Sequence, residues 1–225
     1  MTLVWVGLTL LAYRAALEIH RRSGSRPAAN PMLISVTLVA AVLSLTGTSY
    51  ETYFAGARLV HVLVGPATVA LAIPLHAQIA RLGTMLIPLA IALLVGSLTA
   101  TASAVAIGWA CGASPDVLLA LAPKSVTMPI ALGVAETIGA VSSLTALMVT
   151  LTGISGAIMA DRLLDLTRTD DRAVRGFAVG LTAHAIGTGH VLREGEVAAG
   201  FAALAMGLNG LLTTLWLPLL AALLR

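Results

Sequence analysis

The sequence predicts an all-α membrane protein with about eight hydrophobic segments, some of them broken or re-entrant. Of its 225 residues, 58% are hydrophobic and only 10% are charged, and the mean hydropathy is +0.97. Soluble domains carry about 25% charged residues. The apolar runs are long and lack the alternation of membrane strands, which favours helices over a barrel. We therefore expect residues 1–225 to form a single integral membrane domain in a lipid bilayer.

The few polar residues exclude several other classes of protein. The net charge is only +3 and the arginines gather in loops, which indicates topology rather than nucleic-acid binding. The single cysteine, Cys111, excludes an internal disulfide and a cysteine-based metal cluster. His184 and His190 do not have the i, i+4 spacing of a helical zinc site, and no cysteine or carboxylate completes a tetrahedron. We expect no metal and no cofactor.

The first two apolar segments flank a basic loop. Residues 1–19 predict a first span rather than a cleaved signal peptide, because the amino terminus lacks a basic region and a small-residue cleavage site. The loop at 20–27 holds three arginines, which the positive-inside rule places in the cytoplasm. Residues 31–47 predict a second span. The polar, partly aromatic stretch 48–58 predicts an external loop.

The charge rule also predicts a re-entrant segment. Later apolar segments lie at 59–80, 84–111, 117–138, 141–160 and 197–224. The loop after residue 160 carries four arginines and should also be cytoplasmic. Five apolar segments lie between the two basic loops: 31–47, 59–80, 84–111, 117–138 and 141–160. Five full crossings would place the loops on opposite sides of the membrane, so one of these segments must turn back. The proline-broken 117–138 is the first candidate, and 59–80 is the second.

The stretch 122–133, Ala-Pro-Lys-Ser-Val-Thr-Met-Pro-Ile-Ala-Leu-Gly, predicts a broken helix at membrane depth. Pro123 and Pro129 each lack an N–H and clash with the preceding turn. Irregular backbone in a bilayer survives only where protein or water surrounds it, so this stretch should line a cavity. An intramembrane cation costs at least about 2.5 kcal/mol and usually has a function, which makes Lys124 a candidate site residue.

The hydroxyl groups beside this lysine have two interpretations. Ser125 and Thr127 can contact a substrate, or they can bond the backbone carbonyls that the prolines leave free. Lys124 can likewise bind an anion or extend to the membrane interface.

Two other segments carry similar signals. Residues 59–80 contain Pro66, Thr68 and Pro74, which predict a second broken helix. An offset of 57 residues (123 − 66) aligns Pro66 with Pro123 and Thr68 with Ser125. This offset suggests repeat units near 59–111 and 117–160, the usual frame of secondary transporters.

Residues 180–196 concentrate two histidines, two threonines and four glycines. Gly187 permits positive φ, so we expect a further structural break whose half-helix end faces an anion. His184 is a candidate proton carrier or ligand, or a buried packing histidine, and Thr188 is a second candidate ligand. Asn209 places an amide between glycines in the last span, where the glycine spacing also favours close helix packing.

Three of these regions give the chain a resemblance to the LrgB/CidB family. They are the Pro-Lys-Ser-Val motif at 123–126 with its downstream Pro-Ile-Ala, the Gly-Pro-Ala-Thr-Val run at 65–69, and the Ala-His-Ala-Ile-Gly-Thr run at 183–188. The resemblance covers nearly the whole chain. It implies a multi-pass protein of the bacterial cytoplasmic (inner) membrane. Family members were first described as antiholin-like or holin-like modulators of murein hydrolase activity and cell lysis.

The resemblance also implies a transport function. The plastid glycolate/glycerate transporter is similar to a fusion of an LrgA-like and an LrgB-like part, and bacterial relatives are linked to pyruvate. Together with the broken helices, this favours a secondary transporter of small monocarboxylates with an LrgA/CidA-like partner and a homo-oligomeric assembly. The expected substrate-binding residues are Lys124, Ser125, Thr127, Thr68, His184, Thr188 and Asn209.

A regulator of envelope lysis that assembles with an LrgA-like protein is the alternative hypothesis. It predicts no saturable solute flux. An enzyme is not expected, because the chain has no His-Glu-x-x-His, Gly-x-Ser-x-Gly or paired intramembrane aspartates. It also has no Gly-x-x-x-x-Gly-Lys-[Ser/Thr] motif for ATP.

Overall fold

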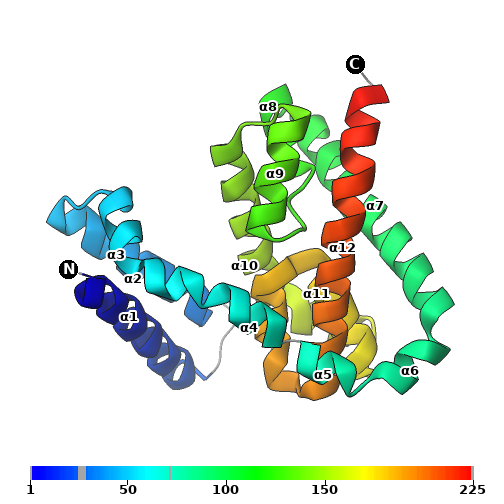
Figure 1. Ribbon diagram of the computed structural model, residues 1–225, viewed down its shortest axis with the longest axis horizontal. Helices are drawn as coiled ribbons and strands as arrows, with labels where there is room; N and C mark the ends of the chain where they lie inside the picture. Colours follow the sequence, from blue (N-terminus) through cyan, green and yellow to red (C-terminus); the bar gives the residue numbers. More distant parts are fainter. Residues whose placement is uncertain (1, 25–28, 71, 224–225) are drawn as a thin grey trace. The chain divides into compact units, whose positions relative to one another are not determined.

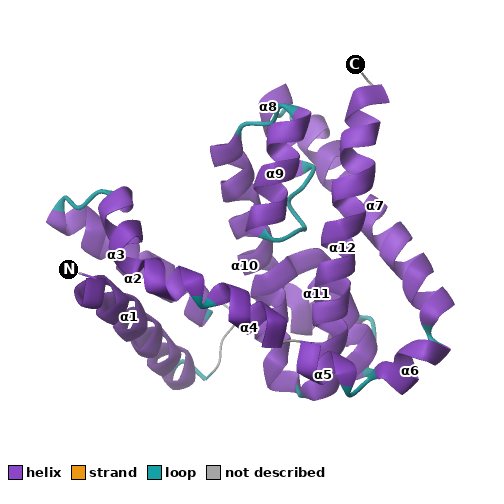
Figure 2. Cartoon of the chain, viewed as in Figure 1, coloured by secondary structure: helices purple, strands orange, loops and turns teal. Residues whose placement is uncertain are grey.

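The computed structural model describes residues 2–24, 29–70 and 72–223, and in this part of the chain every regular element is helical (Figures 1 and 2). The side chains of a few residues inside two short helices lie outside the described set: Val64, Ala67, Thr68, Pro74 and Leu75. The chain divides into two compact units, Met1–Ala70 and Leu71–Arg225. Each unit is considered by itself.

Unit 1 is a small helical cluster. It contains α1 (Thr2–Arg22), α2 (Pro31–Thr46), α3 (Tyr50–Val62) and α4 (Val64–Ala70). The α1 helix packs against α2 and α3, and the Thr9 and Tyr53 hydroxyl groups lie 2.9 Å apart. Gly56 of α3 leaves room for the Trp5 ring, since a Cβ at residue 56 would lie 2.0 Å from Trp5 Cδ1. The predicted loop at 48–58 is wrong, because most of it forms α3, and its external location stays a prediction.

Unit 2 begins with three helices: α5 (Ala72–His76), α6 (Ile79–Thr84) and α7 (Leu86–Ala110). The remaining elements are α8 (Pro115–Leu121), α9 (Met128–Ile138), α10 (Ser142–Leu166), α11 (Arg172–Val191), a 3₁₀ turn at Leu192–Glu194 and α12 (Glu196–Leu223). The predicted break within 59–80 is confirmed as a series of short helices. Pro66 and Pro74 each lie in the first turn of such a helix, where a missing N–H costs no intrahelical bond.

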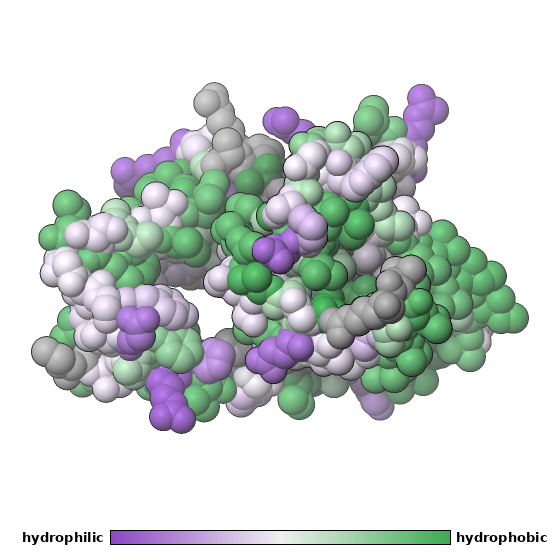
Figure 3. Space-filling model, turned by 90° about the horizontal axis from the view of Figure 1, so that it is seen from above, coloured by the Kyte–Doolittle hydropathy of each residue, from purple (hydrophilic) through white to green (hydrophobic). Residues whose placement is uncertain are grey.

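Four described helices are long and apolar enough to cross a membrane: α1, α7, α10 and α12. The predicted count of eight hydrophobic segments is not confirmed. The α7 helix buries few of its residues, and large side chains such as Ile87 and Trp109 are exposed. Figure 3 shows a continuous hydrophobic surface on the side where α7 lies in Figure 1. This surface fits contact with lipid or a membrane partner.

The α8 and α9 helices form a hairpin that is too short to span a bilayer. At 1.5 Å per residue, 7 and 11 residues give lengths of about 10 and 16 Å. The break between the two helices covers residues 122–127 and contains Lys124, as the proline pattern predicts. Thr101 of α7 donates its hydroxyl to the Ala122 carbonyl at 3.1 Å, which anchors this tip against the middle of a long helix. The far end of α9 packs at Ile138 against Leu217.

The α11 helix is a second hairpin, which turns at His184. Backbone angles there are φ 43° and ψ −137°, which a side-chain-bearing residue rarely adopts. The second arm folds back onto the first arm, residues 172–183, since a Cβ at Gly187 would lie 2.8 Å from Val179 Cγ1. Arg172 at the start of the hairpin donates to the Glu194 carbonyl beyond its end. The break therefore falls at His184, and the prediction of a break at Gly187 is wrong, because this glycine is helical and serves close packing instead.

Within unit 2, the two hairpins start at opposite ends of α12 and extend toward its middle. Both ends of the α11 hairpin lie beside the start of α12, whereas α9 runs along its C-terminal half. Asn209 lies at the middle of α12, 13 residues after Glu196 and 14 before Leu223. It contacts both hairpin tips, which are residues 122–127 of the α8–α9 hairpin and residues 181–184 of the α11 hairpin. The tips therefore meet about halfway along a membrane-length helix.

An ion-pair cluster marks the end of unit 2 at which α11 begins. The Arg175 guanidinium bonds Asp165 at 2.8 Å and Glu194 at 3.0 Å, and it lies 3.5 Å from Asp161. His190 contacts Asp161 at 3.2 Å. The cluster lies beside the second arginine-rich loop, whose cytoplasmic location stays a prediction of the positive-inside rule.

Asp171 caps α11 beside this cluster and gives a pH prediction. Partial burial raises the pKa of Asp171, but the N–H groups of Ala173 and Val174 and the Arg81 guanidinium outweigh it, so the pKa lies below its ordinary value. The ionised carboxylate therefore stabilises the fold above its unfolded-state pKa, and this contribution disappears as the pH falls through the lower native pKa.

Asp171→Asn keeps the capping oxygen and removes the charge, so we expect a loss of about 0.5 kcal/mol at neutral pH for this half-exposed group. Thermal unfolding in detergent between pH 7 and pH 3 measures it. The stability of the variant and the parent should converge as the pH falls below about 4. A gap that stays constant across this range would contradict the prediction.

Candidate functional site

The candidate site lies where the two hairpin tips meet, and Asn209 joins them. Its side-chain N–H₂ group donates to the Ser125 carbonyl at 3.2 Å and to the Leu181 carbonyl at 3.0 Å. Both amide hydrogens are thus used on backbone oxygens that interrupted helices leave free. Asn209 is 1% exposed. The amide therefore holds the tips together. It bonds backbone carbonyls, whereas the sequence predicted that it would contact a substrate.

Lys124 is the polar side chain of the α8–α9 tip that faces open space. It is half-buried, and its ammonium donates to the Ser125 hydroxyl at 3.1 Å. Within the described residues no carboxylate forms an ion pair with it. An unpaired cation at membrane depth favours an anion as its missing partner.

The other two polar side chains of this tip are arranged differently. Ser125 is buried and Thr127 is half-buried at the start of α9, and the Thr127 side chain forms no capping bond there. The α9 N-terminus adds backbone N–H groups that have no acceptor within the helix, together with the positive end of a helix dipole.

His184 is buried at the second tip. Its Nε2 lies 3.0 Å from the Val149 carbonyl of α10, so this nitrogen carries a proton, and in the neutral ring Nδ1 is then an acceptor. A Cβ at Gly153 would lie 2.7 Å from His184 Cε1, so the glycine makes space for the ring. Thr188 donates its hydroxyl to the His184 carbonyl at 2.8 Å, the bond to residue i−4 that threonine commonly makes within a helix.

The structure thus brings together most, not all, of the predicted site residues. Lys124, Ser125 and Asn209 lie in one bonded chain, and His184 and Thr188 lie on the hairpin that Asn209 also holds. The Thr68 side chain lies outside the described set, and Thr68 belongs to unit 1. Its predicted role, and the predicted repeat, stay predictions.

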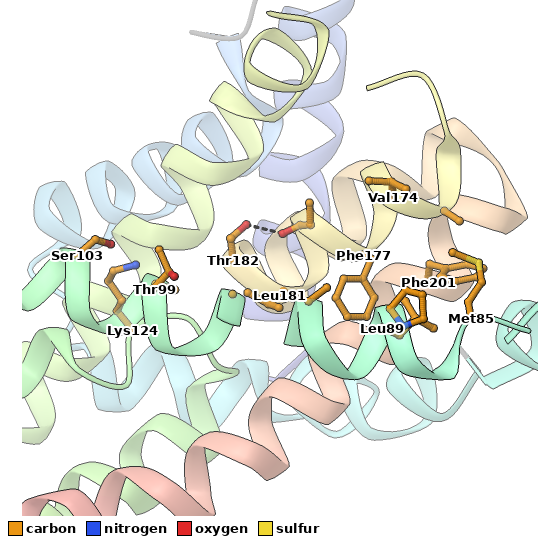
Figure 4. A pocket seen from close by; sticks show the side chains of 16 residues that line it. Met85, Leu89, Thr99, Ser103, Lys124, Val174, Phe177, Leu181, Thr182 and Phe201 are labelled. Carbon is orange, nitrogen blue, oxygen red and sulfur yellow. Dashed lines mark hydrogen bonds between the residues drawn. The ribbon is translucent and has the colours of Figure 1, made fainter. Parts of the chain in front are cut away.

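A pocket of about 650 Å³ opens beside Lys124 (Figure 4). Its walls come from α7, the first arm of α11 and Phe201 of α12. Thr99 and Ser103 of α7 lie near the lysine at one end of the pocket, and Met85 and Phe177 lie toward the other. No sequence pattern selects the Thr99 and Ser103 hydroxyl groups, because threonine and serine on an apolar helix usually bond their own backbone.

Asp161, His190 and Glu194 bring ligand atoms within 4.8 Å of one another, the spacing that a metal ion needs. However, the Arg175 guanidinium already occupies this position and pairs with both carboxylates. A resident arginine repels a second cation, so the cluster reads as an ion-pair network.

Comparison with known proteins places this architecture in a family. The model of the LrgB-like family matches residues 9–223. The chain belongs to the LrgB-like family. Among the relatives of this LrgB-like protein, "Uncharacterized protein YxaC" of Bacillus subtilis (strain 168) is 33% identical over 97% of this chain and 95% of its own length. "Antiholin-like protein LrgB" of Bacillus mycoides (strain KBAB4) is 26% identical over 94% of this chain and 92% of its own length.

An "Antiholin-like protein LrgB" of Bacillus cereus (strain B4264) matches this LrgB-like protein equally well, at 26% identity over 94% of the chain. No solved structure matches it. The family and the four apolar helices together identify a multi-pass membrane protein.

Proposed function

We propose that this LrgB-family protein acts in the bacterial inner membrane as an antiholin-like regulator of murein hydrolase activity and cell lysis. Support comes from relatives named antiholin-like protein LrgB that align over 94% of the chain. A membrane partner of the LrgA type, and further copies of the chain, would pack on exposed apolar surface such as that of α7. Deletion of the gene should then change the rate of autolysis, and purified protein should co-elute with the LrgA-like partner.

We propose a molecular activity for the same protein as well, secondary transport of monocarboxylates, with glycolate, glycerate or pyruvate as the small acids that the family resemblance suggests. The observation that carries this proposal is the meeting of two oppositely entering hairpins beside an unpaired lysine. Interrupted helices near the middle of the bilayer are where secondary transporters bind their substrates. An opening of either tip would expose the site to one side of the membrane.

Each polar group near the tips has a role in this proposal. Lys124 and the N-terminus of α9 attract the substrate carboxylate. Thr127 and Ser125 offer hydroxyl groups to it, and the substrate contact expected of Thr68 stays a prediction. His184, whose Nδ1 remains an acceptor, is the candidate carrier of a coupling proton.

Uptake of labelled pyruvate or glycolate by proteoliposomes tests the transport proposal. Lys124→Ala should lower the rate about a hundredfold, because the loss of one charged bond to the substrate costs about 2.7 kcal/mol. Lys124→Arg should retain part of the rate. Arg193→Ala, an exposed cation outside the hairpin tips, is the matched control and should keep the parent rate.

The same variants separate the two functions. A regulator that works only by assembly predicts no saturable flux and an autolysis phenotype that survives Lys124→Ala. A transporter whose flux underlies the phenotype predicts that both activities fall together. Parent-level uptake by Lys124→Ala would remove the lysine from the transport mechanism.

A further inference from the structure

The pocket beside Lys124 has walls suited to a hydrocarbon chain. Most of its lining side chains are apolar: Met85, Pro88, Leu89, Ala92, Phe177 and Phe201 are among them. At about 650 Å³ it is comparable to pockets that hold drug-sized ligands. Pyruvate or glycolate would fill only a small part of this space. Their polar hydroxyl or keto groups would also meet walls that offer few hydrogen bonds.

Three of the four polar side chains that line the pocket gather at one end, and the fourth, Thr182, donates its hydroxyl to the Ala178 carbonyl at 2.7 Å. Figure 4 shows Lys124 close to Thr99 and Ser103, whereas Phe177 and Phe201 lie toward the opposite end. Along α7 the lining runs from Pro88 to Ser103, which is about 22 Å at 1.5 Å per residue. The pocket is therefore long and amphipathic, with a cationic head region and an apolar body.

The cation of the head region has no carboxylate partner in the part of the chain that the structure describes. The ammonium of Lys124 has one hydroxyl partner, Ser125. A half-buried cation without a counter-ion is costly at membrane depth, so a ligand carboxylate would be strongly favoured there.

We propose that this pocket binds an aliphatic monocarboxylate of the fatty-acid type. The carboxylate lies on Lys124 and the two α7 hydroxyl groups, and the hydrocarbon chain extends toward Phe177 and Phe201. This inference rests on the proposed transport site for its cation, and it names a longer substrate class than glycolate or pyruvate.

A phospholipid fits this pocket less well than a single-chain acid. Lys124 lies at the tip of the α8–α9 hairpin, which meets α12 halfway along its length. A phosphate head group with its glycerol would have to leave the membrane surface to reach it, which a free fatty acid does at lower cost because it carries one small ionisable group.

Binding of radiolabelled laurate to the full-length protein in nanodiscs of zwitterionic lipid tests the proposal. Unlabelled straight-chain acids from butyrate to laurate should compete, with affinity rising about fourfold per methylene group. The methyl ester of laurate should compete at least tenfold more weakly than laurate, and Lys124→Ala should remove this preference for the acid.

Two variants of α7 test the position of the chain. Ala92→Phe places a ring inside the pocket and should shorten the preferred acid. Ile91→Phe changes an outward-facing residue that is 58% exposed, and it should leave the preference unchanged. An unchanged preference in Ala92→Phe, or competition by phosphatidylglycerol that equals competition by laurate, would overturn the proposal.

The laurate measurement and the pyruvate uptake assay can fail separately. If pyruvate competes as well as laurate, the fatty-acid inference falls and the small-acid transport proposal stands. If laurate binds as expected but no acid is transported, the pocket is a binding site and the transport proposal falls.

Discussion

Gly180→Ala is expected to lower the free energy of unfolding by about 3 kcal/mol, at the upper end of the usual cost of overpacking. A Cβ at Gly180 would lie 2.1 Å from the backbone oxygen of Ala202 in α12. A backbone oxygen cannot rotate away as a side chain can, so α11 and α12 would have to separate. Gly176 makes the same approach to the Ala198 oxygen one turn earlier, so the two helices meet along a glycine face.

Thermal or denaturant unfolding of detergent-solubilised protein measures the loss. Gly189→Ala is the matched control, because it lies on the same hairpin and no atom lies within 4 Å of the added Cβ. The control should change stability by less than about 0.5 kcal/mol. Equal losses for the two variants would mean that the α11–α12 contact is not the cause.

Asn209→Leu is expected to be the other large effect, with a loss of about 4 kcal/mol. The substitution leaves the Ser125 and Leu181 carbonyls without their side-chain donor in a buried, apolar setting, and each unsatisfied group costs about 1–3 kcal/mol. Leucine has a similar volume, so the loss would report the missing hydrogen bonds rather than a cavity.

The matched control for this variant is Thr214→Val on the same helix. Its hydroxyl bonds only the Gly210 carbonyl within α12, which keeps its own helical partner after the change. We expect a cost below about 1 kcal/mol for the control. Hydrogen exchange at residues 122–127 should rise in Asn209→Leu alone. Unchanged exchange there would show that the amide does not hold the hairpin tip.

The sequence predicted the membrane class and the α8–α9 break because both depend on local chemistry. Long apolar runs require helices in lipid, and Pro123 and Pro129 interrupt any helix that contains them. The charge rule required a re-entrant segment among five, and α8 and α9 are each too short to cross. The stretch at 48–58 was predicted to be a loop, but polar and aromatic residues also suit an exposed helix such as α3.

The second hairpin could not be placed from sequence because its turn falls on a histidine. Glycine is the usual residue at positive φ, so the sequence predicted the break at Gly187. The structure has it at His184, which adopts φ 43° under tertiary constraint. Asn209 was selected as a ligand, but only the positions of two distant carbonyls reveal its bridging role. The pocket of α7 likewise depends on how α7 packs against α11, which no local pattern encodes.

Cross-linking of the two hairpin tips tests the central claim, that they meet inside the membrane. The Ser125 and Leu181 carbonyls share one amide, so cysteines at these two positions lie within reach of a short bis-maleimide. In a Cys111→Ser background, Ser125→Cys with Leu181→Cys should form an intramolecular cross-link in native membranes, and Ser125→Cys with Leu166→Cys should not. Efficient cross-linking of the second pair, or none in the first while both cysteines react with a single maleimide, would contradict the meeting of the tips.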